Sequence, residues 1–124
     1  MFRTDSENNI YATRGDVVSL LITANNGETS FTFPAGTVIR LKVFQKKNCA
    51  NVMMSKDVTV DTETAQVAMT LSEDDTRIGE VISKPVDYWY EVEMNPDTAS
   101  QTIIGYDEDG AKLFRLYPEG GGDE

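Results

Sequence analysis

Histidine is absent from the sequence, and cysteine occurs once, as Cys49. Without histidine the chain has no Ser-His-Asp or Cys-His catalytic site, no imidazole general base and no zinc site that contains histidine. A single cysteine forms neither an internal disulfide nor a Cys-x-x-Cys metal or redox site, so the fold has to be stable without cross-links. This cysteine usage fits a reducing compartment, and we expect no cofactor.

Basic residues and long apolar runs are also scarce. The 124 residues include 11 Lys and Arg against 21 Asp and Glu, which gives a formal net charge of −10. Because such a chain repels phosphate groups, we expect no nucleic-acid partner and no membrane partner. No apolar run is long enough to cross a bilayer, and the polar start of the sequence does not resemble a secretory signal. The sequence therefore predicts a soluble protein made in a cytoplasm.

Alternation of apolar and polar residues is the main pattern that the sequence does contain. In residues 88–94, Tyr88 and Tyr90 share one face of an expected strand with apolar residues, whereas Trp89 and Glu91 lie on the other face. Similar segments, separated by turn residues, recur along the chain. The expected strands, of which 37–46 is the longest, are residues 16–23, 31–33, 37–46, 52–60, 66–71, 88–94, 101–104 and 113–117, and residues 10–12 are a candidate for a further short edge strand.

A chain of 124 residues has room for one ordinary domain. The sequence predicts an all-β fold, a single immunoglobulin-like or jelly-roll-like β-sandwich of about seven to eight short antiparallel strands. We expect a flexible N-terminal segment over residues 1–9, the sandwich over residues 10–118 and a flexible acidic, Gly-rich tail over residues 119–124. Segments 52–60 and 66–71 are separated by a short turn and predict a hairpin.

One short helical turn is predicted near residues 72–78. Ser72 can accept a hydrogen bond from the backbone N–H three residues on, and the acidic residues Glu73, Asp74 and Asp75 favour the positive end of a helix. Neighbours in sequence point in different directions on a helical turn, so these acids do not form a paired-carboxylate acid/base site. The sequence nominates no catalytic residue and predicts a protein that is not an enzyme.

Six short segments follow one another in a characteristic order: IYATRGD at 10–16, NNG at 25–27, VIRLKV at 38–43, AMTLSEDDT at 68–76, YWYEV at 88–92 and TIIG at 102–105. In this order they resemble the small β domain at the start of phage baseplate upper proteins and in related prophage tail proteins. The resemblance implies a virion structural or adaptor protein, made in the bacterial host cytoplasm, with other virion subunits as partners and usually a symmetric homo-oligomer. Baseplate upper proteins continue into a long coiled-coil or fibre-bearing region, which this sequence does not contain, so a stand-alone tail or head protein is the other reading.

The polar face of the strand over residues 88–94 is the candidate interface. Trp89 and Glu91 share this face, and Lys42, Lys46 and Lys56 concentrate the scarce positive charge on two adjacent expected strands. Tryptophan is enriched at protein interfaces, and the lysines could match an acidic face of a neighbouring copy. The alternative function is a carbohydrate-binding or adhesion module of the β-sandwich type, in which Trp89 would stack on a sugar ring.

Two further motifs favour structural interpretations. Arg14-Gly15-Asp16 could bind an integrin, but it lies where a loop enters an expected strand, which favours Gly15 as a backbone turn residue. Asp107 and Asp109 are candidate ligands of a loose calcium site, although the full calcium-loop pattern fails. A solvated turn explains them better, so no metal is expected.

Overall fold

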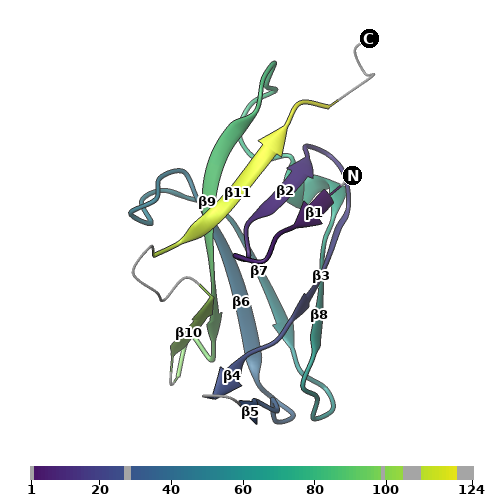
Figure 1. The fold of residues 1–124 in the computed structure, drawn as a ribbon, viewed down its shortest axis with the longest axis vertical. Helices are drawn as coiled ribbons and strands as arrows, with labels where there is room; N and C mark the ends of the chain where they lie inside the picture. Colours follow the sequence, from purple (N-terminus) through teal and green to yellow (C-terminus); the bar gives the residue numbers. More distant parts are fainter. Residues whose placement is uncertain (1, 27–28, 99, 105–109, 120–124) are drawn as a thin grey trace.

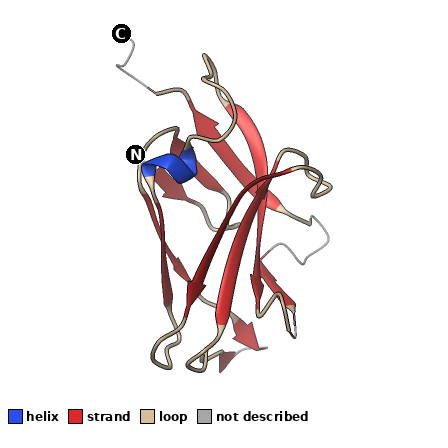
Figure 2. Ribbon diagram, turned by 180° about the vertical axis from the view of Figure 1, so that it is seen from behind, coloured by secondary structure: helices blue, strands red, loops and turns tan. Residues whose placement is uncertain are grey.

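The computed structural model describes residues 2–26, 29–98, 100–104 and 110–119. Two β layers make up the fold, and the prediction of an all-β sandwich is confirmed (Figures 1 and 2). The elements are β1 (Phe2–Thr4), β2 (Ile10–Thr13), β3 (Val18–Ile22), β4 (Asn25–Asn26), β5 (Thr29–Ser30), β6 (Val38–Phe44), β7 (Val52–Thr59), β8 (Val67–Leu71), α1 (Glu73–Thr76), β9 (Val86–Met94), β10 (Gln101–Ile104) and β11 (Lys112–Tyr117).

The two layers differ greatly in width. The large sheet has the order β1-β2-β11-β9-β6-β7, and β10 pairs with the far end of β9. The small sheet contains β3 and β8 alone, and β4 and β5 form a separate short ribbon. Every strand pair among the described residues is antiparallel except β2 with β11, which departs from the predicted antiparallel arrangement. The small sheet therefore faces a large sheet that is several strands wider.

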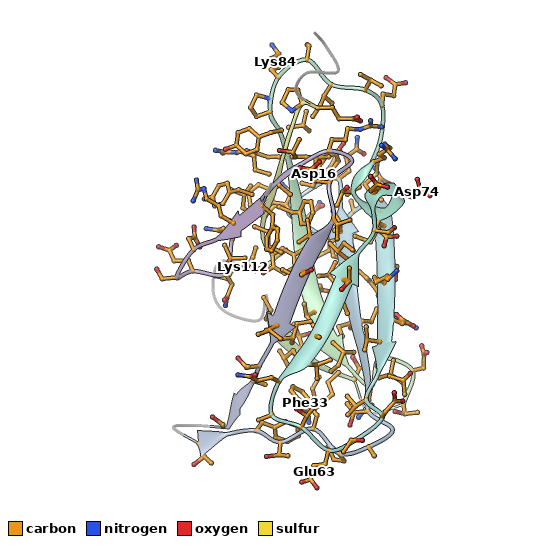
Figure 3. All side chains as sticks on the ribbon, turned by 90° about the vertical axis from the view of Figure 1, so that its right-hand side faces the viewer. Asp16, Phe33, Glu63, Asp74, Lys84 and Lys112 are labelled. Atoms are coloured by element: carbon orange, nitrogen blue, oxygen red, sulfur yellow. The ribbon has the colours of Figure 1, made fainter. Side chains whose placement is uncertain are left out.

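Alternation along the strands builds the core between the layers. Tyr88 and Tyr90 are buried and point inward, whereas Trp89 and Glu91 are partly exposed on the outer face, as predicted. Each large apolar side chain buried in this way stabilises the fold by about 1.5–3 kcal/mol. Phe33, labelled in Figure 3, is buried although it lies outside both sheets. The other largest buried apolar side chains come from both layers: Phe114, Ile10, Ile39, Leu41, Met69, Leu71, Leu116, Val18, Val43 and Val92.

The predicted hairpin between segments 52–60 and 66–71 is wrong. β7 pairs with β6 in the large sheet, and β8 pairs with β3 in the small sheet, so the chain changes layer between them. Val60 is buried at this crossing, and its N–H donates to the carbonyl of Thr37 at 2.8 Å. Because β8 pairs with β3, its buried residues, every second one along the strand, cover the core from the layer opposite β7.

The N-terminal residues also differ from the prediction of a flexible segment over residues 1–9. Phe2–Thr4 forms β1, which pairs with β2, and Phe2 packs against the core. Asp5 holds the turn that follows, because its carboxylate accepts the backbone N–H groups of Glu7 and Asn9 at 2.9 Å each. The sequence also predicts the longest strand over residues 37–46, but β6 there has seven residues and β9 has nine.

The short helix begins as predicted and ends sooner. Ser72 Oγ accepts from the Asp75 N–H at 3.2 Å, and the Ser72 N–H donates to Asp75 Oδ2 at 2.8 Å, which is a complete capping box. The helical residues are Glu73–Thr76, because Arg77 leaves the helical conformation. Within the described residues, no helix is long and apolar enough to cross a membrane.

Candidate docking site

β3 presents an unusual edge. Its sequence lies in an uncharged run from residue 17 to residue 27, in a chain of which 26% of residues are charged. In the part of the chain that the structure describes, β3 pairs with β8 on one side and with no strand on the other. Val18 and Ile22 point into the core, whereas Val17, just before β3, and Leu21 are 49% and 68% exposed. This edge therefore combines unpaired backbone groups with exposed apolar side chains.

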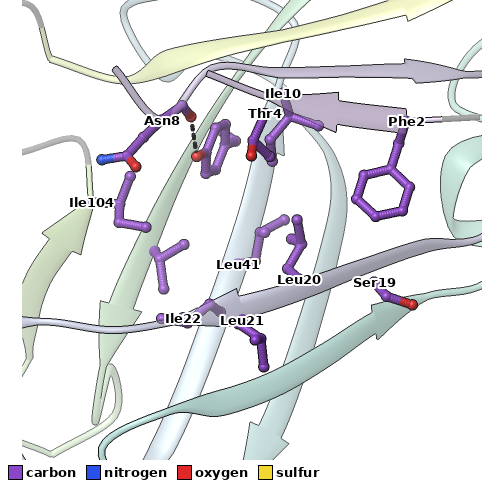
Figure 4. A pocket seen from close by; sticks show the side chains of 12 residues that line it. Phe2, Thr4, Asn8, Ile10, Ser19, Leu20, Leu21, Ile22, Leu41 and Ile104 are labelled. Atoms are coloured by element: carbon purple, nitrogen blue, oxygen red, sulfur yellow. Dashed lines mark hydrogen bonds between the residues drawn. The ribbon is translucent and has the colours of Figure 1, made fainter. Parts of the chain in front are cut away.

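A cavity of about 300 Å³, lined mainly by apolar residues, opens beside the same edge (Figure 4). β1 and β2 form one wall, β3 forms the opposite wall, and β6 and β9 form the floor. Its position follows from the unequal width of the layers, because the small sheet stops at β3 while the large sheet continues to β1. The lining residues are Phe2, Thr4, Asn8, Ile10, Ser19, Leu20, Leu21, Ile22, Leu41, Tyr90, Val92 and Ile104.

Tyr90 contributes an apolar surface to this cavity although it carries a hydroxyl group. That hydroxyl donates a hydrogen bond to the carbonyl of Asn8, so its polar end is occupied within the fold. Burial, together with the charge of Asp5, raises the pKa of Tyr90, and the ring stays neutral in the physiological range. The ring edge also meets Phe114, with ring centroids 6.4 Å apart.

The cavity can bind a ligand by shape and by backbone hydrogen bonds, but it holds no set of reactive side chains among its described residues. Tyr90 is the one ionisable side chain among the described lining residues, so no acid, base and nucleophile converge there.

No group of three or more His, Cys, Asp or Glu side chains that could hold a metal ion occurs within the described ranges. Asp107 and Asp109, the candidate calcium ligands, lie outside the described residues. Comparisons of the chain with protein-family models, curated proteins and solved structures find no match.

The predicted interface residues Trp89, Glu91 and Lys42 do lie together on the outer face of the large sheet. Lys42 Nζ pairs with Glu93 Oε1 at 3.2 Å, and this ion pair compensates a buried carboxylate oxygen that has no hydrogen-bond partner among the described residues. The Trp89 ring is half-buried, and Lys47 Nζ lies 5.4 Å from its centre. Burial, with the nearby charge of Glu93, raises the pKa of Glu91.

The predicted lysine cluster is divided by the structure. Lys56 lies opposite Leu41 in the β6–β7 register and therefore points to the inner face, where its Nζ pairs with Asp75 Oδ2 at 3.0 Å. Lys42, one residue further along β6, points to the outer face, since successive residues of a strand alternate. Lys46 is exposed in the connection between β6 and β7. Lys42 and Lys56 therefore lie on adjacent strands but on opposite faces of the large sheet.

Arg14-Gly15-Asp16 has a structural role. The Arg14 side chain is 8% exposed, and its guanidinium donates to the carbonyl of Gly79 at 3.0 Å and to Glu119 Oε1 at 2.9 Å. Gly15 has a φ of +87° and donates its N–H to Thr76 Oγ1 at 3.0 Å. A buried arginine is not available to a receptor. Glu119, expected to begin a flexible tail, is held by this arginine.

Sequence reasoning missed the β3 edge and the cavity wall that β1 supplies. The available signal was the uncharged run over residues 17–27, but such a run also describes a strand buried on both sides. Which strands lie beside β3 depends on the pairing of segments far apart in the sequence. Periodicity alone does not contain that information.

Proposed function

We propose that this protein is a non-enzymatic structural or adaptor subunit of a phage or prophage virion, of the tail or baseplate type, that works by assembling with other protein chains. One observation supports assembly above all others. Three features occur together: an edge of β3 without a strand partner among the described residues, the exposed side chains of Val17 and Leu21, and the cavity that β3 lines. The resemblance of the chain's short segments to phage baseplate upper proteins supports the virion setting.

An exposed strand edge of this kind usually carries protection against pairing with another chain. Charged side chains, prolines or bulges are the common devices, and β3 contains none of them. Its residues instead include an exposed leucine and two β-branched side chains, Val18 and Ile22, which favour the strand conformation. An edge without protection is expected where pairing with a partner is the purpose of the surface.

The outer face of the large sheet is less suited to the alternative function of carbohydrate binding. A sugar platform needs an open aromatic plane with polar side chains beside it. Trp89 is instead half-buried, with the Lys47 ammonium near its ring. The geometry at the β3 edge therefore favours protein assembly.

The proposal that the protein belongs to a virion is tested by finding out whether purified phage particles contain it. Particles released from the bacterium that encodes the protein would be separated on a density gradient and analysed by quantitative mass spectrometry. We expect the protein to co-migrate with tail proteins at a constant ratio, while a cytoplasmic host protein of similar mass stays at the top. Absence of the protein from every particle fraction would contradict the proposal.

A further inference from the structure

We propose that the gap between β3 and β1 receives one extended segment of a partner protein, which pairs with β3 and places alternate apolar side chains in the cavity. This inference rests on the proposed assembly function and specifies how the partner is held. Addition of a strand to a free sheet edge is a general mode of peptide recognition, in which the backbone gives affinity and side-chain pockets give specificity.

The lining of the cavity shows that it meets the edge of β3 rather than one of its faces. Four successive residues, Ser19 to Ile22, line it, although successive side chains of a strand point to opposite faces. On the opposite wall, Phe2 and Thr4 belong to β1, the last strand of the large sheet. Two sheet edges thus border one gap (Figure 4). A strand in that gap would lie beside the backbone edge of β3, with the floor residues Leu41 and Val92 beneath it.

The backbone of the β3 edge favours an extended segment over a helix. A helix lying on this edge would leave the N–H and C=O groups of β3 unpaired, which costs free energy when they are covered. A strand satisfies these groups and needs space for alternate side chains only.

Charge defines the chemistry of the partner segment. The wall residues of β3 and the floor residues Leu41 and Val92 are uncharged, so the central residues of the segment should be uncharged and alternately apolar. The protein as a whole carries a net charge of −10, and Glu7 is exposed next to Asn8 at the rim. Lys or Arg residues at the ends of the segment would therefore be attracted. The inferred occupant is an apolar strand with basic ends, contributed by another protein.

A displayed library of random peptides about ten residues long, panned against the full chain, tests this inference. We expect selected peptides to alternate apolar and polar residues and to carry Lys or Arg at their ends. Leu21→Lys puts a charge on the exposed edge, and Leu20→Trp fills the cavity, so each should weaken binding at least about tenfold. Val81→Lys is the matched control, because Val81 is 85% exposed and does not line the cavity, and its binding should stay within about twofold of wild type.

Amide hydrogen exchange, followed by NMR, locates the bound peptide. Protection of amides in both Val18–Ile22 and Phe2–Thr4 supports the inference. Failure to select alternating peptides overturns it, as does a selected peptide that binds Leu21→Lys as tightly as wild type. It is also overturned if the chain alone forms dimers that Leu21→Lys dissociates, because the occupant would then be a second copy. If the protein is present in particles but selects no such peptide, this inference fails and the proposed function stands.

Discussion

Arg14 joins three parts of the chain that are distant in sequence. Its guanidinium contacts the carbonyls of Ile78 and Gly79, which follow α1, and the carboxylate of Glu119 beyond β11. The backbone N–H of Arg14 also donates to the carbonyl of Tyr117 at 2.9 Å. Removal of a buried donor leaves its acceptors without partners, and such losses are larger than those of exposed ion pairs.

Arg14→Ala should therefore lower the free energy of unfolding by about 2–4 kcal/mol. The matched control is Arg77→Ala, because Arg77 pairs with Asp74 and Glu119 but its side chain is 43% exposed. We expect the control to cost less than about 1 kcal/mol. Urea denaturation of both variants measures the difference. An equal loss of unfolding free energy in the two variants would contradict the structural role of Arg14.

The carboxylate of Asp5 gives the β1–β2 turn a dependence on pH. The hydrogen bond from the backbone of Asn9 is the largest cause that holds the pKa of Asp5 below its usual 3.8, against a smaller opposing effect of desolvation. Since the folded pKa is lower than the unfolded one, this contribution to stability is present above about pH 4 and is lost as pH falls through the folded pKa.

An NMR titration tests this assignment at the single residue. The amide proton of Asn9 should shift with a midpoint below pH 3.8, the ordinary value for this carboxyl group. Asp5→Asn keeps the shape of the side chain without the charge, so the same amide should show no such transition. A midpoint at or above 3.8 in the wild-type protein would show that the carboxylate does not hold the turn.

At the scale of elements, β1 is the part of the fold that sequence reasoning left out and that completes the cavity. Phe2 packs against the core and lines the cavity, so Phe2→Ala should lower the free energy of unfolding by about 1–2 kcal/mol. Phe2→Leu, which keeps most of the apolar surface, should cost less. Thermal or chemical denaturation measures both. A loss below about 0.5 kcal/mol for Phe2→Ala would favour the flexible N-terminal segment that the sequence predicts.

Local patterns account for the elements that the sequence predicts correctly. Alternation in β9 determines which side chains enter the core, and the Ser72–Asp75 pair determines where α1 begins. Strand pairing was harder to predict, because the partner of β8 is β3, far away in the sequence, and not the preceding β7. Lys56 illustrates the consequence, since its register against β6 decides which face it occupies. The candidate site depends on these long-range pairings and could not be derived from local periodicity.

At the scale of the whole molecule, charge and apolar surface are separated. The outer face of the large sheet carries ion pairs such as Arg40 with Asp57 at 2.8 Å and Arg115 with Asp87 at 2.7 Å. Because these charges are paired within the protein, they attract a charged partner less strongly. The β3 edge is uncharged and lies beside the cavity. The molecule therefore has a self-paired polar side and a side suited to docking.

Amide hydrogen exchange along β3 in the isolated full-length chain tests the central claim most directly. Because β3 has a strand partner on one side only among the described residues, alternate amides of Val18–Ile22 should exchange much faster than the amides between them. β9 provides the internal control, because Trp89 and Tyr90 pair with both β6 and β11 while Val92–Met94 pair with both β6 and β10, and these residues should be protected without alternation. Uniform protection along β3, equal to that of β9, would show that its edge is already paired and would contradict the account.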